Sequence, residues 1–318
     1  MPSDSVDILE STIRRHADLL DILLMDQTKR KQKHHNIIWA TDSYKGFKPT
    51  AEILPEHITG EYSLLIQPRI AKSKEEQRHR TKEKAEVFTP DRIVDEMNKQ
   101  VDWNGENWPV DSKNWQNYVK EAKLEITCGE APFIVNRYNA ANGRTVRNIE
   151  DRVGFLDRKL RIVSKYCDDK ANWLFWAKEA YKASYGYEWQ GDNLLIAREN
   201  LLYTFKDYWN AKFPTDKINL DRKVSDEKLA IIKEIATIIS WNIFQMDGLK
   251  YIIPMSGTGK KEKVEEVPPM FALFGGDYKK TVKKAQEKAG KPVYIMDWEK
   301  GKPIKFESLL VDSRSKKR

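Results

Sequence analysis

Short apolar segments alternate with long amphipathic ones in the second half of the chain, and this order most constrains the fold. The segments LEIT at 124–127, YGYEWQG at 185–191 and WNIFQMDGL at 241–249 each hold a short apolar run that ends at a turn. Helical patterns follow at 191–213 and 225–240. Strands that alternate with helices favour a parallel α/β sheet with crossover helices. Ligands of such sheets bind at the carboxyl ends of the strands.

The rest of the chain adds helices, a strand and a hairpin. Helices are expected at 6–26, 73–86, 91–101, 150–166 and 171–184, a strand at 63–67, and a hairpin at 293–310 that turns at Lys300 and Gly301. The 73–86 helix is highly charged with almost no apolar face, so we expect it on the surface. Two regions are therefore predicted: a helical, basic N-terminal region at 1–84 and an α/β domain at 85–318 that contains the hairpin.

Bulk composition restricts the class of protein. The chain has 318 residues, of which 40% are hydrophobic, enough for a sizeable core. It has no run of 18 apolar residues, so no membrane partner is expected. The N-terminus lacks the basic-then-apolar pattern of a secretory signal. We therefore expect a cytoplasmic protein in which Cys128 and Cys167 are reduced thiols.

Positive charge is clustered along the chain. The net charge is +8, and basic clusters occur at 28–35, 68–84 and 313–318. This pattern favours a polyanionic partner such as nucleic acid, and a solvated surface is the alternative. The candidate phosphate contacts of the second cluster are Arg69, Lys72, Lys74, Arg78, Arg80 and Lys82.

The segment LEITCGEAPFIV, residues 124–135, bends tightly after the first apolar run. Gly129 would let the backbone approach a ligand, and a loop between strand and helix presents amides at a helix N-terminus. A bend between two buried elements is the alternative. Glu188 ends the second apolar run, where a carboxylate can accept both hydroxyls of a ribose. Asp247 ends the third, where a carboxylate could accept a hydrogen bond from an adenine amino group.

This order of motifs resembles the amino-methylating DNA adenine methyltransferases of restriction–modification systems, and in particular stand-alone restriction-enzyme methylase subunits. The segments AEVFTP, TCGEAP, LDRKLR, GYEWQGDNLL and WNIFQMDGL carry the resemblance, over roughly residues 36–310. It implies a Rossmann-like methyltransferase sheet, S-adenosylmethionine as cofactor and double-stranded DNA as substrate. It also implies a restriction endonuclease or a second methyltransferase subunit as partner. The implied reaction is direct methyl transfer to the amino nitrogen of a flipped base.

The resemblance also implies a set of cofactor-binding residues. The Phe-Thr-Pro segment at 88–90 matches one that packs near the methionine end of the cofactor. The turn at 125–131 matches the family's Asp-Pro-x-Cys-Gly-Ser-Gly in its central Cys-Gly but ends in Glu-Ala. Glu188, with the following IARENLL, matches the acidic strand end and its helix, and Asp247 matches the adenine-binding aspartate. The implied set is Phe88, Thr89, Pro90, Glu125, Cys128, Gly129, Glu130, Ala131, Glu188, Trp189, Asp247, Gly248 and Leu249.

The family's catalytic loop, a polar residue followed by Pro-Pro and an aromatic residue, is altered here. The chain's Pro-Pro pair lies in VPPM at 267–270, where valine cannot accept a hydrogen bond and methionine is not aromatic. Pro268, Pro269 and Phe271 are the candidates for this loop, and a lysine-rich surface loop is the alternative. The alternative function is accordingly a catalytically degenerate methyltransferase-fold subunit that binds DNA or assists assembly.

A long connection of 59 residues separates Gly129 from Glu188. The predicted helix with LDRKLR falls inside it, and Arg158, Lys159 and Arg161 could contact phosphates, with a solvated helix face as the alternative. No Cys/His pair has zinc spacing, so no metal is expected. A metal-dependent nuclease is a minor alternative, because a highly charged chain matches its short acidic and lysine motif by chance.

Tryptophan is abundant, with ten in the chain. Most are expected to fill the interior, and stacking on an extruded base is the alternative for those near the site. The tryptophans near predicted core or site elements are Trp103, Trp108, Trp173, Trp176, Trp189 and Trp241.

Overall fold

The computed structural model describes residues 12–29, 35–84, 86, 89–257 and 290–310. The chain divides into two compact units, Met1–Gln245 and Met246–Arg318, and each unit is described by itself. Short 3₁₀ helices occur at η2 (Ile13–Arg15), η3 (Gln27–Lys29), η4 (Pro55–His57), η5 (Gly60–Tyr62), η6 (Arg69–Ala71) and η7 (Ile149–Asp151).

Three parallel strands form the sheet of the first unit. They are β1 (Lys123–Glu125), β2 (Ser184–Glu188) and β3 (Ile243–Gln245), and β2 lies between the other two. In register, Glu125 pairs with Gly186, and Glu188 pairs with Gln245. The predicted parallel α/β sheet is therefore confirmed, and the ends of neighbouring strands meet at one edge.

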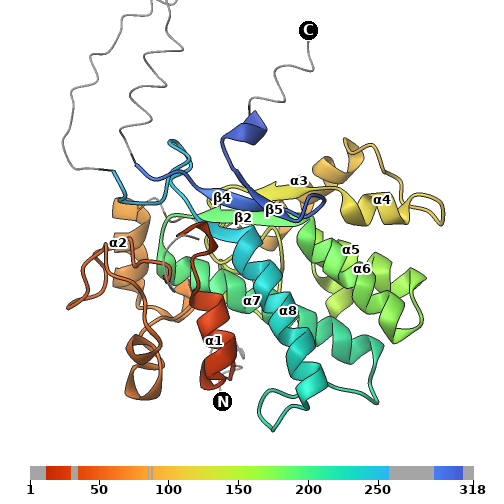
Figure 1. The fold of residues 1–318 in the computed structure, drawn as a ribbon, viewed down its shortest axis with the longest axis horizontal. Helices are drawn as coiled ribbons and strands as arrows, with labels where there is room; N and C mark the ends of the chain where they lie inside the picture. Colours follow the sequence, from red (N-terminus) through yellow and green to blue (C-terminus); the bar gives the residue numbers. More distant parts are fainter. Residues whose placement is uncertain (1–11, 30–34, 85, 87–88, 258–289, 311–318) are drawn as a thin grey trace, which may run out of the picture. The chain divides into compact units, whose positions relative to one another are not determined.

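Each crossover between strands contains two helices. The first holds α5 (Phe155–Tyr166) and α6 (Lys170–Lys182), and the second holds α7 (Gly191–Lys212) and α8 (Asp226–Asn242). Figure 1 shows these helices stacked beneath the strands. Polar side chains cap the N-termini of two of these helices. The side chain of Asp169 accepts a hydrogen bond from the amide of Asn172 in α6, and the side chain of Ser225 accepts one from the amide of Lys228 in α8.

Helix α7 is the centre of the core. Nearly all of its residues up to Trp209 are buried, including Leu194 and Ile196 on opposite sides of the helix. A helix that is buried around its circumference must be covered by neighbouring elements on all sides. It contacts β2, β3, α5 and α8. Trp173 of α6 packs edge-on against Trp209, with ring centroids 5.8 Å apart, so aromatic packing joins the two crossovers.

The N-terminal segment belongs to the same unit as the sheet. Instead of one helix over 6–26, the described part contains η2 and then α1 (Ala17–Leu24). His16 is extended between them, and its Nε2 lies 2.8 Å from the carbonyl oxygen of Leu220. Helix α1 packs on α8. The predicted boundary at residue 84 is therefore not where the chain divides, because apolar residues such as Leu23 complete the core.

Three further helices precede β1: α2 (Lys74–Lys84), α3 (Asp91–Trp103) and α4 (Trp115–Lys120). Pro90 is the N-cap of α3. The predicted strand at 63–67 is wrong, because these residues form turns. Two of their backbone carbonyl groups are hydrogen-bonded to a side chain and not to a neighbouring strand. The carbonyl oxygens of Ser63 and Ile66 accept hydrogen bonds from Arg14 Nη1 at 2.9 and 3.1 Å.

The second unit contains the predicted hairpin. Strands β4 (Tyr294–Asp297) and β5 (Lys302–Lys305) are antiparallel, and Gly301 at the turn has a φ of 61°. Asp297 Oδ1 accepts from the amide of Lys300 at 3.0 Å. The candidates Pro268, Pro269 and Phe271 lie outside the described residues. Among the helices that are described, none has the length and apolar character needed to span a membrane.

Candidate functional site

The turn after β1 has an unusual backbone. Thr127, Gly129 and Ala131 have φ values of 46°, 54° and 66°. Glycine adopts this conformation freely, whereas each of the other two pays about 1 kcal/mol. The predicted tight turn is therefore present. The next α-helix begins only at Phe155, within the predicted 150–166 helix, so the turn does not lead directly into a helix.

Hydrogen bonds fasten this turn to the end of β2. The amide of Cys128 donates to the carbonyl oxygen of Tyr187 at 2.8 Å. The amide of Gly129 donates to Glu188 Oε2, also at 2.8 Å. The glycine turn and the acidic strand end thus lie together, although 59 residues separate them in the chain.

A pocket of about 730 Å³ opens beside the turn. This volume is within the range of small-molecule sites. The predicted residues that line it are Thr89, Glu125, Cys128, Gly129, Glu188 and Trp189, together with the predicted phosphate contact Lys82. The sequence did not single out the remaining lining residues: Ala40, Glu83, Glu86, Ile126, Thr127, Pro132, Phe133, Gln190 and Asn193.

Glu188 is the central polar group of this pocket. Its carboxylate accepts from the amides of Gly129 and Gln190, at 2.8 and 3.1 Å. Burial raises the pKa of Glu188 to about 7, and these amides only partly oppose that effect. An ionised carboxylate offers about four lone pairs, so Glu188 can still accept two hydroxyl donors.

The raised pKa makes the stability of the fold pH-dependent. Between pH 4.5 and about 7, folded Glu188 holds a proton that the unfolded chain releases. The free energy of unfolding should therefore fall by about 2 kcal/mol from pH 5 to pH 8. Urea denaturation of wild type and Glu188→Gln measures this. The variant should gain stability relative to wild type as the pH rises, and an equal difference at both pH values would contradict the assignment.

Glu125 and Cys128 have supporting roles. Glu125 accepts from the amides of Phe133 and Ile134 at 3.3 and 3.1 Å, which holds the far side of the turn. Burial raises the pKa of Glu125 well above its usual value. Burial also raises the pKa of the Cys128 thiol, so Cys128 is not a thiolate nucleophile at neutral pH.

Other predicted cofactor contacts lie away from the pocket lining. Glu130 is buried and accepts from Tyr138 Oη and from the amide of Arg69, both at 2.6 Å. Ala131 is fully buried. Neither these two residues nor Pro90 lines the pocket. Glu130 and Ala131 shape the turn, and Pro90 is the N-cap of α3, while their contact with a cofactor stays a prediction.

The remaining predicted residues fall elsewhere. Phe88 lies outside the described residues. Asp247, Gly248 and Leu249 belong to the second unit. Asp247 Oδ1 accepts from the amides of Leu249 and Lys250, at 3.0 and 3.1 Å. The structure thus brings together the ends of the first two strands, and the role of Asp247 stays a prediction.

Three predicted phosphate contacts are buried inside the protein. Arg80 donates to Glu86 Oε2 at 2.6 Å and to Asp192 Oδ2 at 2.8 Å. Lys72 pairs with the same oxygen of Asp192 at 3.4 Å. Lys159 donates to backbone carbonyl oxygens, and burial lowers its pKa well below the usual value. These side chains bind internal partners, so assigning them to DNA phosphates was wrong.

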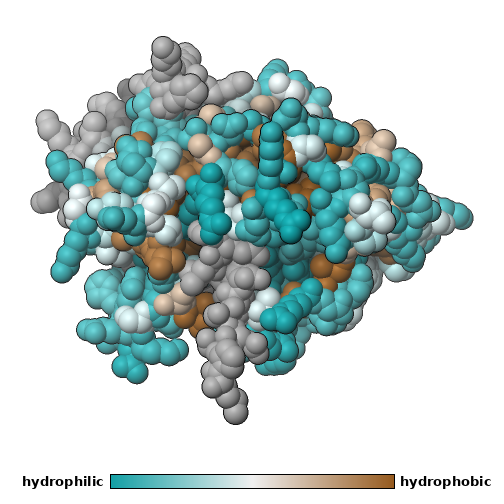
Figure 2. All heavy atoms as spheres, turned by 90° about the horizontal axis from the view of Figure 1, so that it is seen from below, coloured by the Kyte–Doolittle hydropathy of each residue, from teal (hydrophilic) through white to brown (hydrophobic). Residues whose placement is uncertain are grey.

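The other predicted phosphate contacts divide into two groups. Arg158 pairs with Asp95 and Asp102, and Arg161 donates to backbone carbonyls. Arg69 donates to Thr81 Oγ1 at 2.9 Å. The exposed members are Lys74, Arg78 and Lys82 on α2. On the face shown in Figure 2, hydrophilic residues cover most of the surface and apolar residues form small separate patches.

Sequence reasoning missed Asp192, which organises this side of the site. It is fully buried and accepts from Tyr44 Oη at 2.7 Å as well as from Arg80 and Lys72. Burial alone would raise the pKa of Asp192, but Lys72 and Arg80 outweigh it and lower that pKa. The available signal was an acidic residue in the first turn of α7, a position where acids commonly occur because they favour the helix dipole.

No family description, curated protein or solved structure matches this chain. Over the part of the chain that the structure describes, no group of three His, Cys, Asp or Glu side chains could hold a metal ion. A functional assignment therefore depends on the geometry and chemistry of the pocket.

Proposed function

We propose that this chain binds S-adenosylmethionine in the pocket beside β1 and β2 and methylates an exocyclic amino group of adenine in DNA. The proposal assigns it to the Rossmann-like methyltransferases of restriction–modification systems. The observation that carries it is the 2.8 Å hydrogen bond from the Gly129 amide to Glu188, which unites the glycine turn and the acidic strand end in one pocket.

The order of the strands supports this proposal. The strand that ends in the glycine turn pairs with the strand that ends in Glu188, and both run in the same direction. Ligands of parallel sheets bind where such strand ends meet. Glu188 would accept the ribose hydroxyls, and Gly129 would allow the ligand to approach the backbone closely.

The charge of the pocket also favours this cofactor over a nucleotide polyphosphate. Carboxyl groups outnumber cations in the lining, with Glu83, Glu86, Glu125 and Glu188 against one lysine, Lys82. Glu86 is paired with Arg80, and burial raises the pKa of Glu125 and Glu188, so the lining carries little net charge. Such a lining offers acceptors to an ammonium group and to ribose hydroxyls but only one cation to bind phosphates. Trp189 adds an aromatic face, which attracts cations as well as planar rings.

The bound cofactor would supply the methyl group, already activated on a sulfonium. The residues of the chain would then act by positioning, with Glu188 fixing the ribose so that the methyl group faces the target nitrogen. The target base would have to leave the duplex, because its amino group is otherwise paired.

Calorimetric titration with S-adenosylmethionine, followed by labelled-methyl transfer to mixed-sequence DNA, tests the proposal. We expect binding, together with label on adenine. Binding without transfer would support the alternative, a degenerate subunit, which the VPPM sequence at 267–270 favours because it lacks a polar and an aromatic residue at the required positions. Absence of binding would contradict both readings of the pocket.

The exposed cations of α2 should contribute to DNA affinity. Replacing Lys74, Arg78 and Lys82 together with alanine should reduce the slope of log affinity against log salt by about 2 to 3, because each phosphate contact contributes about 0.9. Fluorescence anisotropy with duplex DNA at several salt concentrations measures the slope. The control replaces Arg222 and Lys223, exposed cations of the loop before α8, with alanine. If both variants keep the wild-type slope, DNA binds elsewhere.

A further inference from the structure

A second set of hollows in the first unit lies apart from the proposed cofactor pocket. One has a volume of about 280 Å³ and the other about 870 Å³. Asp95, Asp151 and Val153 line both hollows, so the two hollows adjoin, and together they are called the α3–α5 groove. None of its lining residues lines the pocket of Glu188.

Two exposed tryptophans form one end of the α3–α5 groove. Trp103 and Trp108 are 56% and 41% exposed, and both line the larger hollow. Indole rings normally bury most of their surface. Lys99 and Lys165 lie in the same lining and are exposed. This end therefore offers flat aromatic surface beside positive charge.

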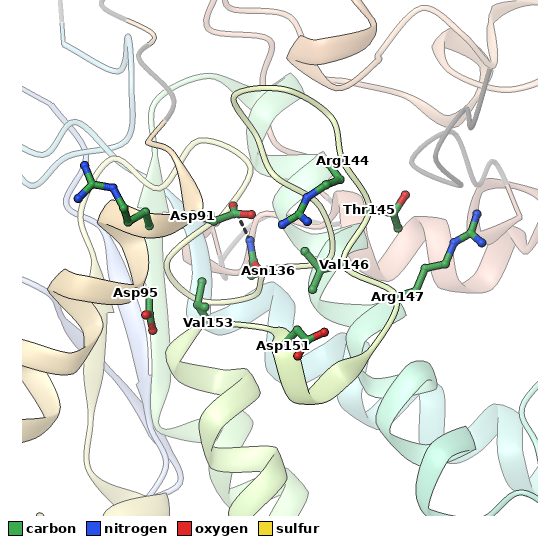
Figure 3. Close-up of a pocket in the computed structure, with 10 residues that line it drawn as sticks. Asp91, Asp95, Asn136, Arg144, Thr145, Val146, Arg147, Asp151 and Val153 are labelled. Carbon is green, nitrogen blue, oxygen red and sulfur yellow. Dashed lines mark hydrogen bonds between the residues drawn. The ribbon is translucent and has the colours of Figure 1, made fainter.

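Two arginines lie at the other end of the groove. Arg144 and Arg147 are exposed, and over the described part of the chain their guanidinium groups have no hydrogen-bond or ion-pair partner. Figure 3 shows the Arg144 side chain turned toward Asp91 and Asn136, while Arg147 extends away from them at the rim. Asn136 is buried, donates to Asp91 Oδ1 at 3.1 Å, and has an Oδ1 atom without a donor.

The charge of the groove is positive overall. Its lining contains eight Lys and Arg residues against five Asp and Glu residues. Many of these charges are paired within the protein: Asp95 and Asp102 pair with Arg158, Lys99 pairs with Asp95, and Arg152 pairs with Asp207. Among the described residues, the groove cations without an ion pair are Lys165 beside the aromatic surface and Arg144 and Arg147 at the other end.

We propose that the α3–α5 groove binds single-stranded nucleic acid, with bases stacked on Trp103 and Trp108 and phosphates at Arg144 and Arg147. Aromatic platforms beside cations are the general means of binding single strands, because every base has a face that can stack. A duplex hides these faces, so paired DNA should bind this groove more weakly. The inference does not depend on cofactor binding or methyl transfer.

Fluorescence anisotropy with a labelled oligothymidylate of about 12 nucleotides tests this, since single-strand sites span ~4–16 nucleotides. Trp103→Ala and Trp108→Ala should each weaken binding by about tenfold. Replacing Arg144 and Arg147 with alanine should reduce the salt slope by about 1 to 2. The matched controls are Phe175→Ala, an exposed aromatic on α6, and the Arg222 and Lys223 double variant.

The outcomes are separable. Stronger binding of the single strand than of the matching duplex, with both controls near wild type, would support the groove. Tryptophan variants that bind as the Phe175 control does would overturn it, as would thymidine monophosphate binding as tightly as the oligomer. Near-ultraviolet circular dichroism establishes that each variant is folded. All groove variants should keep wild-type affinity for S-adenosylmethionine, so failure here is distinguishable from failure of the cofactor proposal.

Discussion

Glu188→Ala is expected to weaken S-adenosylmethionine binding by at least about 100-fold, because two hydrogen bonds to a buried charged acceptor are lost together. Glu188 is the group at the end of β2 that lines the pocket with unused lone pairs. Isothermal titration at pH 8, where the carboxylate is ionised, gives the affinity.

Two comparisons make this result interpretable. Glu188→Gln keeps the shape and one acceptor oxygen, so its affinity should lie between those of wild type and alanine. Glu227→Ala removes an exposed carboxylate from the first turn of α8 and should leave binding unchanged. A thermal melt of each variant shows whether it is folded. Wild-type affinity in folded Glu188→Ala would exclude Glu188 as the ribose acceptor.

Arg80→Met is expected to destabilise the fold by about 3 to 5 kcal/mol, because it leaves two carboxylates buried without their cation. Arg80 has no exposed surface and pairs with Glu86 and Asp192. Burial would lower the pKa of Arg80, but the two acids outweigh it and raise that pKa, so the guanidinium is always charged. Urea denaturation at neutral pH measures the free energy of unfolding.

Arg78→Met supplies the matched control in the same helix. Arg78 is exposed, and its replacement should change stability by no more than about 0.5 kcal/mol. Combining Arg80→Met with Asp192→Asn should cost less than the sum of the single changes, since both remove the same interaction. Equal destabilisation by Arg78→Met and Arg80→Met would show that the buried ion pairs of Arg80 do not contribute to the free energy of unfolding.

The sheet and its long helices were predictable because their signals are local. The apolar runs that become β1, β2 and β3 are short and bounded by turns, and α7 and α8 extend over many turns of periodic pattern. The glycine turn and Glu188 were also found from their positions after apolar runs. Their meeting follows from the parallel pairing of β1 with β2.

The errors came from interactions between residues far apart in the sequence. Arg80 lies in a helix with no apolar face, which indicated a solvated surface, yet its acidic partner Asp192 is supplied by α7, 112 residues later. The 63–67 strand failed for the same reason, because Arg14 bonds the backbone oxygens that a strand would need. One amino-acid sequence on its own does not reveal which residues that are far apart in the chain will pair in the folded protein.

The bond between Gly129 and Glu188 places the loop and the proposed ligand on one carboxylate. One carboxylate oxygen already receives the amide of the turn, so a ribose diol would share the carboxylate with the loop. Ligand affinity and loop conformation would then be thermodynamically linked, and each would affect the other by the same free energy. A substitution at Thr127 or Ala131 that relaxes the backbone could thus tune affinity through conformational strain alone.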